Sequence, residues 1–538
     1  MHAPWKIRGR GECRVMTSPM ARLQQKTQAA ATTGSAGSTG IPRAMGYGLY
    51  VISPVSGYLM HTSSCEYRQR LIPCWKVVLW GAGYVAGDWA GTIWRSSPGK
   101  RGAILHAALV HRPGPCIRRL AGNRSDEVRF TRFLRNDRVS VAEMASHAAS
   151  RTAARIAGRE IIVVQDTSEL FLGGGRAKAN GYGPVGKGGG TRGLLLHAAL
   201  ALDADNDALL GLADVQVWNR DKGKVTPRRS RSTADKESQR WLSVAVQAGA
   251  LLSAARSITV ISDRESDIYE HFAERPANVE LLVRSNWNRK IKLASGSFTQ
   301  LFAYVDSLPE AGRFSVTIPA APGRKQRTAE LSLRFSPVSL CRPHPSPGPD
   351  LPDSIPLTMV DVREISSSHD GQPIHWRLLT THAVKSPKQA RRMVDLYRKR
   401  WSIEEFFRTL KSAGFDIEEA DIGDPQVMIK FVAAAAVAAV TIMQLVRARD
   451  GTTNEQLAEA FEPDDKPVLE ALSTQLEGAT ERQKNPHPKG TLAFAAWVIA
   501  RLGGWTAYYG KPGPKVMRIG LQDFRRIKYG STLTLKNV

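Results

Sequence analysis

Three carboxylates in distant parts of the chain could together hold hard metal ions. Asp166 and Asp263 each follow a short apolar run that is typical of a buried strand, and Glu404 lies in a segment with helical periodicity. Three carboxylates can bind two divalent cations through oxygen, and such ions act on phosphate esters. An aspartate after a strand is also a common cap or turn residue, so neither aspartate alone identifies a site.

The segment around Glu404 carries a stripe of functional side chains. Tyr397, Arg400, Glu404 and Lys411 lie at offsets 0, 3, 7 and 14. At about 100° per residue they fall within roughly 60° of one another on a helix. An aromatic ring, two cations and a carboxylate therefore share one face. A solvated face with an internal Arg400–Glu404 ion pair has the same pattern, and spacing alone leaves both interpretations open.

The elements that must position these residues alternate between strand and helix. The predicted strands are 160–164, two strands within 194–217 with a turn at 203–207, 257–262, 279–284 and 376–381. Helices are predicted at about 234–255 and 387–413. Alternation of this kind indicates an α/β domain in which Asp166 and Asp263 lie at strand ends, where ligand sites form.

Two regions depart from this pattern. Residues 297–375 are rich in short β segments, contain a proline-rich stretch and predict a β-rich insertion with a long loop. In the first 115 or so residues the only acidic residues are Glu12, Glu66 and Asp88, and no helical period persists. This segment is either a flexible basic arm or translation outside the native reading frame. Its tryptophan and cysteine content favours the second.

The amino-acid composition indicates the kind of binding partner and the cellular compartment to expect. The 538 residues are 42% hydrophobic and carry a formal net charge of +26, which favours a polyanion, either nucleic acid or a membrane surface. The five cysteines form no C-x-x-C pair, which argues against a zinc ribbon or disulfide framework and fits a reducing cytoplasm. The longest apolar run, Phe431–Val446, is shorter than a bilayer span of about 20 residues. Nucleic acid is therefore the favoured partner, and a cytoplasmic location is expected.

Four ordered motifs give the chain a family resemblance over roughly residues 117–530. The stripe Tyr397-x2-Arg400-x3-Glu404-x6-Lys411 resembles the YREK signature of bacterial insertion-sequence DDE transposases, the IS-four group. Asp263-Arg264-Glu265-Ser266-Asp267 resembles the DREAD segment of that group, with Ser in place of Ala. Gln165-Asp166-Thr167-Ser168 is similar to its first-aspartate motif, and Lys236-Glu237-Ser238 with Trp241 is similar to its helix before the second aspartate.

The resemblance implies a fold and an active site. The fold would be α/β, a ribonuclease-H-like catalytic core with a β-rich insertion and a helical C-terminal region. Asp166, Asp263 and Glu404 would be the catalytic triad holding two Mg²⁺ or Mn²⁺ ions. The residues implied to contact DNA are Tyr397, Arg400, Lys411, Arg408, Arg284 and Trp376, the last by stacking on a flipped base.

The expected organisation follows from the resemblance and the composition together. Its parts are an atypical N-terminal segment (1–116), a remnant of a helical DNA-end-binding region (117–158), the first part of the core (159–296), the β-rich insertion (297–375), the second part of the core with the YREK helix (376–450), and a helical region that could dimerise (451–538). Only Asn123–Val139 resembles the end-binding domain that members of the family carry.

The implied function is cut-and-paste DNA transposition by metal-dependent hydrolysis and strand transfer at transposon ends. The expected partners are terminal-repeat and target DNA and a second copy of the chain, in the cytoplasm at the nucleoid. A non-catalytic DNA-binding derivative is the main alternative, because the N-terminus departs from the family. A metal-dependent nuclease without strand transfer is a third, against which the YREK stripe and Trp376 argue.

Overall fold

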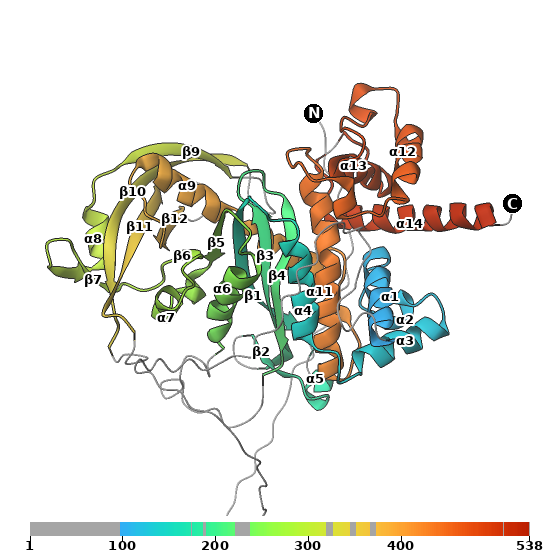
Figure 1. Ribbon diagram of the computed structural model, residues 1–538, viewed down its shortest axis with the longest axis horizontal. Helices are drawn as coiled ribbons and strands as arrows, with labels where there is room; N and C mark the ends of the chain where they lie inside the picture. The colour runs from blue at the N-terminus through green and yellow to red at the C-terminus, as the bar shows by residue number, and fades with distance from the viewer. Residues whose placement is uncertain are drawn as a thin grey trace, which may run out of the picture. The chain divides into compact units, whose positions relative to one another are not determined.

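The computed structural model describes residues 97–536 apart from 174, 187–189, 221–236, 319–325, 345–350, 366–372 and 509. It is a mixed α/β fold. One 12-stranded sheet runs in the order β2-β3-β1-β5-β6-β12-β11-β10-β7-β8, with β4 also paired to β3 and β9 to β10. Figure 1 shows this sheet beside a group of helices. An α/β fold is therefore confirmed.

Five strands form the part of the sheet that carries the candidate site. They are β4 (Leu209–Trp218), β3 (Thr191–Asp203), β1 (Glu160–Phe171), β5 (Ser257–Ser262) and β6 (Glu280–Arg284). Strand β3 is antiparallel to both β4 and β1, whereas β1, β5 and β6 are parallel to one another. Parallel strands are normally covered on both faces, which explains why Ile161–Val164 of β1 is apolar and fully buried.

The predicted end of the first strand was wrong. Strand β1 does not stop at Asp166 but continues for another five residues, to Phe171, because β3 pairs with it along this whole stretch. Its parallel partner β5, however, pairs only as far as Val164. Asp166 therefore lies just past the point where β1 and β5 cease to pair.

The rest of the sheet continues directly from this core. Strand β12 (His375–Thr380) pairs with β6 and leads to β11 (Ser354–Glu364), β10 (Arg327–Cys341) and β9 (Gly312–Ile318). The short strands β7 (Lys290–Lys292) and β8 (Phe298–Gln300) form the last hairpin. The β-rich region expected at 297–375 thus extends the same sheet, with helix α8 (Leu301–Ser307) packed against it.

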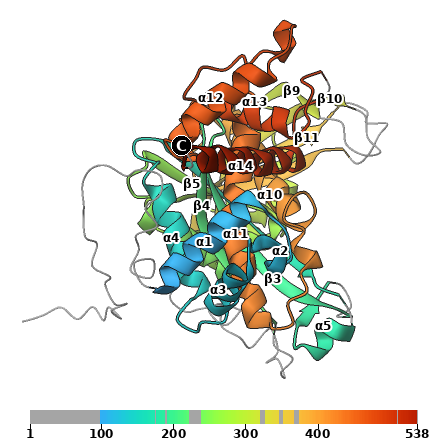
Figure 2. The same cartoon turned by 90° about the vertical axis from the view of Figure 1, so that its right-hand side faces the viewer.

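The long helix α11 (Pro425–Ala448) lies at the centre of the helical layer. It packs on β4 and on helices α1 (Ser97–His111), α3 (Arg124–Leu134), α4 (Val141–Ala153), α13 (Leu492–Leu502) and α14 (Pro514–Lys536). Figure 2 shows α1, α3 and α14 around it. Among the described residues α11 is the one helix long and apolar enough to cross a membrane, by length and composition only, and most of it is buried here as a core helix.

Part of the N-terminal segment, where the sequence showed no persistent helical period, is helical in the structure. Residues 97–111 form helix α1, and its Leu105 and Leu109 are fully buried in the same core as α11. The composition of the first 115 residues hid this helix, because the basic and small residues of the segment mask a short apolar stripe. Residues 1–96 lie outside the described residues.

Candidate active site

The first carboxylate is held in place by its own strand. The backbone N–H of Thr167 donates to Asp166 Oδ1 at 2.7 Å. Burial, with smaller contributions from the negative charges of Glu404 and Asp263, raises the pKa of the Asp166 carboxyl to about 7, although Arg400 and the Thr167 N–H oppose the rise. The three carboxylates are thus close enough to influence one another's ionisation.

The second carboxylate lies at the end of β5. Asp263 caps the 3-10 turn η3 (Arg264–Ser266), and its side chain accepts the Arg264 N–H. Its carboxylate is 31% exposed, so it faces the crevice with room for a partner. The prediction that an apolar strand ends on this aspartate is confirmed.

Arg400 lies between the first and third carboxylates. Its Nη1 is 2.8 Å from Asp166 Oδ2, and its Nη2 is 3.0 Å from Glu404 Oε1. The guanidinium is only 13% exposed, and Asp263 also lies within its electrostatic reach. One cation therefore supplies positive charge to all three carboxylates.

The backbone at Arg400 differs from the single long helix predicted over 387–413. Helix α9 (Pro387–Arg398) ends at Arg398, and α10 (Trp401–Lys411) begins after Arg400. Between them the N–H groups of Lys399 and Arg400 bond three residues back, in the manner of a 3-10 turn. Side chains three residues apart eclipse in such a turn, so Tyr397 and Arg400 align more closely than on a straight α-helix.

Tyr397 and Trp376 form an aromatic pair beside this turn. Tyr397 is 5% exposed, and burial raises its pKa to about 12, with Asp263 adding to the rise and the nearby cations Arg400 and Arg284 opposing it. The ring of Trp376, on β12, meets the ring of Tyr397 edge to face with centroids 5.7 Å apart. Trp376 is half-buried, so part of its ring remains available to another molecule.

The remaining predicted DNA contacts are spread more widely. Arg284, at the end of β6, donates to the His375 carbonyl at 3.1 Å and so stays near the aromatic pair. Lys411, the last residue of α10, donates to the Glu169 carbonyl and lies 3.4 Å from Glu418. Arg408 is 61% exposed and pairs with Glu405 at 3.6 Å. The structure thus places Arg284 near Tyr397, whereas Lys411 and Arg408 lie further along α10.

A buried hydrogen-bond network behind Asp166 was missed by sequence reasoning. Arg240 Nε donates to Thr167 Oγ1 at 2.7 Å, so the Thr167 hydroxyl donates to His197 Nδ1 at 2.9 Å. His197 Nε2 then donates to Gln165 Oε1 at 3.1 Å. Burial lowers the pKa of His197 well below its usual value, which keeps the ring neutral in this role. These bonds fix β1 on both sides of Asp166.

Trp401 was also missed. Its side chain is 67% exposed and directly follows Arg400 in the chain. The signal was present, because an aromatic residue next to the polar stripe of α10 has no place in the core. An exposed indole beside the site offers a surface for stacking on a base.

The donor atoms fit a hard cation in type. All three candidate ligands are carboxylates, the ligands that Mg²⁺ and Mn²⁺ prefer. Over the described ranges, however, no group of three or more His, Cys, Asp or Glu side chains is placed so that it could hold a metal ion. The Arg400 guanidinium bridges Asp166 and Glu404 instead and provides the positive charge that these carboxylates need.

No model of a known protein family matches this chain.

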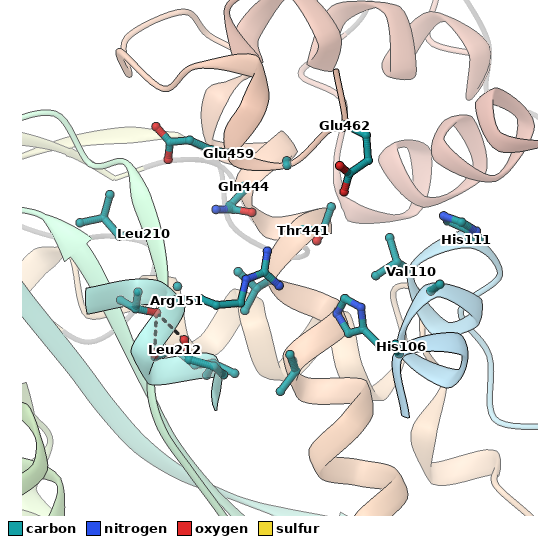
Figure 3. Close-up of a pocket in the computed structure, with 18 of the residues that line it drawn as sticks. His106, Val110, His111, Arg151, Leu210, Leu212, Thr441, Gln444, Glu459 and Glu462 are labelled. Atoms are coloured by element: carbon teal, nitrogen blue, oxygen red, sulfur yellow. Dashed lines mark hydrogen bonds between the residues drawn. The ribbon is translucent and has the colours of Figure 1, made fainter. Parts of the chain in front are cut away.

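A separate cavity of about 420 Å³ lies where α1, α4, α11 and α14 meet β4. In Figure 3, His106, Arg151 and Glu462 point toward this space. Its charged residues already have partners in the protein: Arg155 donates to the carbonyls of Leu210 and Glu459, and Arg525 bonds Asp465 at 2.6 Å. The cavity shares no residue with the carboxylate cluster, and its lining holds four Arg or Lys and two Glu side chains.

Proposed function

We propose that this protein is a DDE-type DNA transposase that cuts and joins DNA at the ends of an insertion sequence. One observation carries the proposal. Asp166, Asp263 and Glu404 come from three distant segments, yet they converge around Arg400 and beside Tyr397. These are the residues that the family resemblance singles out, and a merely solvated helix face would not contact a carboxylate on the distant strand β1.

The arrangement of strands supports a ribonuclease-H-like core as part of this proposal. Three antiparallel strands, β4, β3 and β1, are followed in the sheet by the parallel strands β5 and β6. The first two carboxylates then lie on the neighbouring strands β1 and β5, and the third comes from a helix after the β-rich extension. The resemblance implies this order of the strands and the helix that hold the three carboxylates.

In this proposal Asp166, Asp263 and Glu404 would hold two Mg²⁺ or Mn²⁺ ions. Bound ions of this kind activate an attacking oxygen and stabilise the leaving oxygen of a phosphodiester. The chain's own cations then have two tasks. Arg400 opposes the effect of burial on the pKa of Asp166 and holds Asp166 and Glu404 together before the ions bind, and Arg284 supplies positive charge for a phosphate at the edge of the site.

Exposed arginines on the first helices support DNA as the partner. Helix α2 (Ile117–Leu120) exposes Arg118 and Arg119, and the end of α3 is followed by the exposed Arg135 and Arg138. Arginines on one short helical region are suited to phosphate contacts, which account for much of the affinity of DNA-binding proteins. We infer that this region contacts the transposon end, with a second copy of the protein on the partner end.

The test is cleavage of a labelled duplex that contains the inverted repeats flanking the coding sequence. We expect Mg²⁺- or Mn²⁺-dependent nicks, then hairpins and fully cut ends, because one site performs successive reactions. Excess EDTA should abolish all three products. Undiminished nicking in EDTA, or no cutting of any flanking sequence with either ion, would overturn the proposal.

The second candidate is a DNA-binding derivative without catalysis. The Arg400 bridge favours it, because a guanidinium that stays between Asp166 and Glu404 would exclude metal ions. The same experiment separates the two candidates. A derivative would bind the repeats with unchanged affinity in Mg²⁺ and EDTA and would produce no cut ends.

A further inference from the structure

We propose that the protein has a docking surface for an unpaired DNA segment, formed by Trp287 and by one face of the β7–β8 hairpin. This surface, the Trp287 surface, consists of Trp287, Lys290, Lys292 and Phe298. The proposal rests on the proposed function, since it names a part of the DNA substrate that the carboxylate cluster does not contact.

The loop that carries Trp287 is fixed by a buried carboxylate. Asp267, which is 2% exposed, accepts the N–H groups of Asn286 at 2.7 Å and Trp287 at 3.0 Å. It also binds Arg289 through Nε at 3.2 Å and Nη2 at 3.0 Å. The Trp287 side chain nevertheless remains 59% exposed. A well-anchored backbone thus presents a large apolar ring to solvent.

The hairpin that follows presents a second aromatic ring among cations. Lys292 is opposite Phe298, and Lys290 is opposite Gln300, so these side chains share one face while Ile291 is buried on the other. Phe298 is 56% exposed, and Lys290 Nζ lies 4.3 Å from its ring centroid. No acidic residue occurs at the four positions of this face.

Position along the chain connects the surface to the candidate active site. The loop begins directly after β6, whose last residue, Arg284, lies near Tyr397. Trp287 lies three positions after Arg284, and Lys290 lies three positions after Trp287. Each step spans at most about 10 Å of extended chain. A DNA strand leaving the carboxylates can therefore reach the surface within a few nucleotides.

The chemistry of the surface favours unpaired DNA over duplex. Aromatic faces stack on bases that have left the helix, and interleaved lysines contact the phosphates between them. In a duplex the base faces are already stacked on one another. Lysines near a sheet edge can also prevent sheet-to-sheet aggregation, and β7, which carries both lysines, lies next to the edge strand β8, but that role needs neither of the exposed rings.

The experiment measures binding of the full chain to a labelled single strand of about 15 nucleotides. The comparison strands are an abasic oligonucleotide of the same length and the duplex. Trp287→Ala should weaken single-strand binding by about 5- to 150-fold, the range that corresponds to the loss of one stacked base. Trp287→Phe should restore much of the binding. Tyr529→Ala removes an equally exposed ring on α14 and serves as the matched control.

The outcomes distinguish this inference from the proposed function. Equal single-strand binding by wild type and Trp287→Ala, or equal losses on the abasic strand, would overturn the docking surface whether or not the protein cuts DNA. Trp287-dependent binding without metal-dependent cutting would support the surface and count against the transposase. If the Lys290→Gln, Lys292→Gln double variant aggregates but binds the single strand normally, the lysines protect the sheet edge and the surface as defined is wrong.

Discussion

Arg400 controls the charge of the candidate site through two contacts. It is an ion-pair partner of both Asp166 and Glu404, and its side chain is 13% exposed. Removing one partner from such a buried pair leaves the other uncompensated, which is strongly unfavourable. The arginine and any bound cation therefore compete for the same oxygens, and loading the site requires Arg400 to move toward another anion, for which a DNA phosphate is the natural choice.

Single substitutions of the carboxylates test the proposed triad. Asp166→Asn, Asp263→Asn and Glu404→Gln should each abolish cutting of the flanking repeats while leaving DNA binding within a few fold, because each removes a negative charge with little change of shape. Product gels and a binding titration measure the two effects. Glu405→Gln is the matched control, since Glu405 lies next to Glu404 but pairs with the exposed Arg408. Near-normal cutting by any of the three would remove that residue from the triad.

Substitution of Trp376 tests the reaction step that follows the first nick. The residue is half-buried and touches Tyr397, which leaves both a core role and a stacking role open to experiment. For a stacking residue, Trp376→Ala should cause nicked product to accumulate before the hairpin, with a loss of about 1–3 kcal/mol at that step and an almost unchanged melting temperature. A core residue would instead lower stability by about 3–5 kcal/mol and slow every step equally.

At the scale of elements, sequence pattern located the strands well and the helix ends poorly. The two strands expected in 194–217 are β3 and β4, with the turn where it was placed. The predicted helix over 387–413 is interrupted at Lys399 and Arg400, although both residues have high helix propensity. Arg400 reaches Asp166 on a distant strand, and no local pattern encodes that contact.

The candidate site, likewise, could be predicted only in part from the sequence. Its carboxylates could be proposed from motifs, because strand ends and helical spacing are local features. The Arg240–Thr167–His197–Gln165 network could not, because it joins α6 (Gln239–Leu251), β1 and β3 through side chains that look like ordinary core or surface residues in sequence.

The segment between α11 and the turn η5 (Leu457–Glu459) should make stability depend on pH. Glu455 is 1% exposed, and burial raises its pKa to about 8, with Glu459 adding to the rise. The unfolded chain ionises this group near pH 4.3, so the folded state binds more protons between about pH 4.3 and 8 and loses stability as pH rises through that window.

Glu455→Gln removes this ionisation. At pH 8 to 9 the free energy of unfolding of the variant should exceed that of wild type by about 2–5 kcal/mol, so the variant should melt at a higher temperature. The two melting temperatures should converge near pH 4 to 5. Calorimetry in matched buffers measures the difference. Glu470→Gln, at a partly exposed carboxylate paired with Lys489, should show no such trend. A constant difference between variant and wild type at every pH would show that Glu455 does not titrate in this range.

At the scale of the whole molecule, helix α1 belongs to the folded core. Because Leu105 and Leu109 are fully buried, removing residues 1–116 deletes part of the core. A protein that begins at residue 97 keeps α1, and one that begins at residue 117 should melt at a lower temperature than it or fail to fold.

Leu109→Ala in the full chain provides the same test without truncation. It should cost about 2–5 kcal/mol, the usual penalty for a buried leucine. Ile104→Ala is the control, because Ile104 lies on the same helix and is 37% exposed. A chain beginning at residue 117 that is as stable as the full chain, together with a silent Leu109→Ala, would show that α1 adds nothing to the core.

The buried alanines of α11 limit which substitutions the sequence can accumulate over generations. Ala433, Ala435, Ala436, Ala438 and Ala439 are all fully buried. A single-nucleotide change converts an alanine codon to valine, and each such change would force extra methyl groups into closed space at a cost of about 1–3 kcal/mol. A mobile element that is no longer selected accumulates such changes. If the protein is the transposase proposed above, genomic copies that still move should keep these alanines, while valines at these positions should mark copies that have decayed.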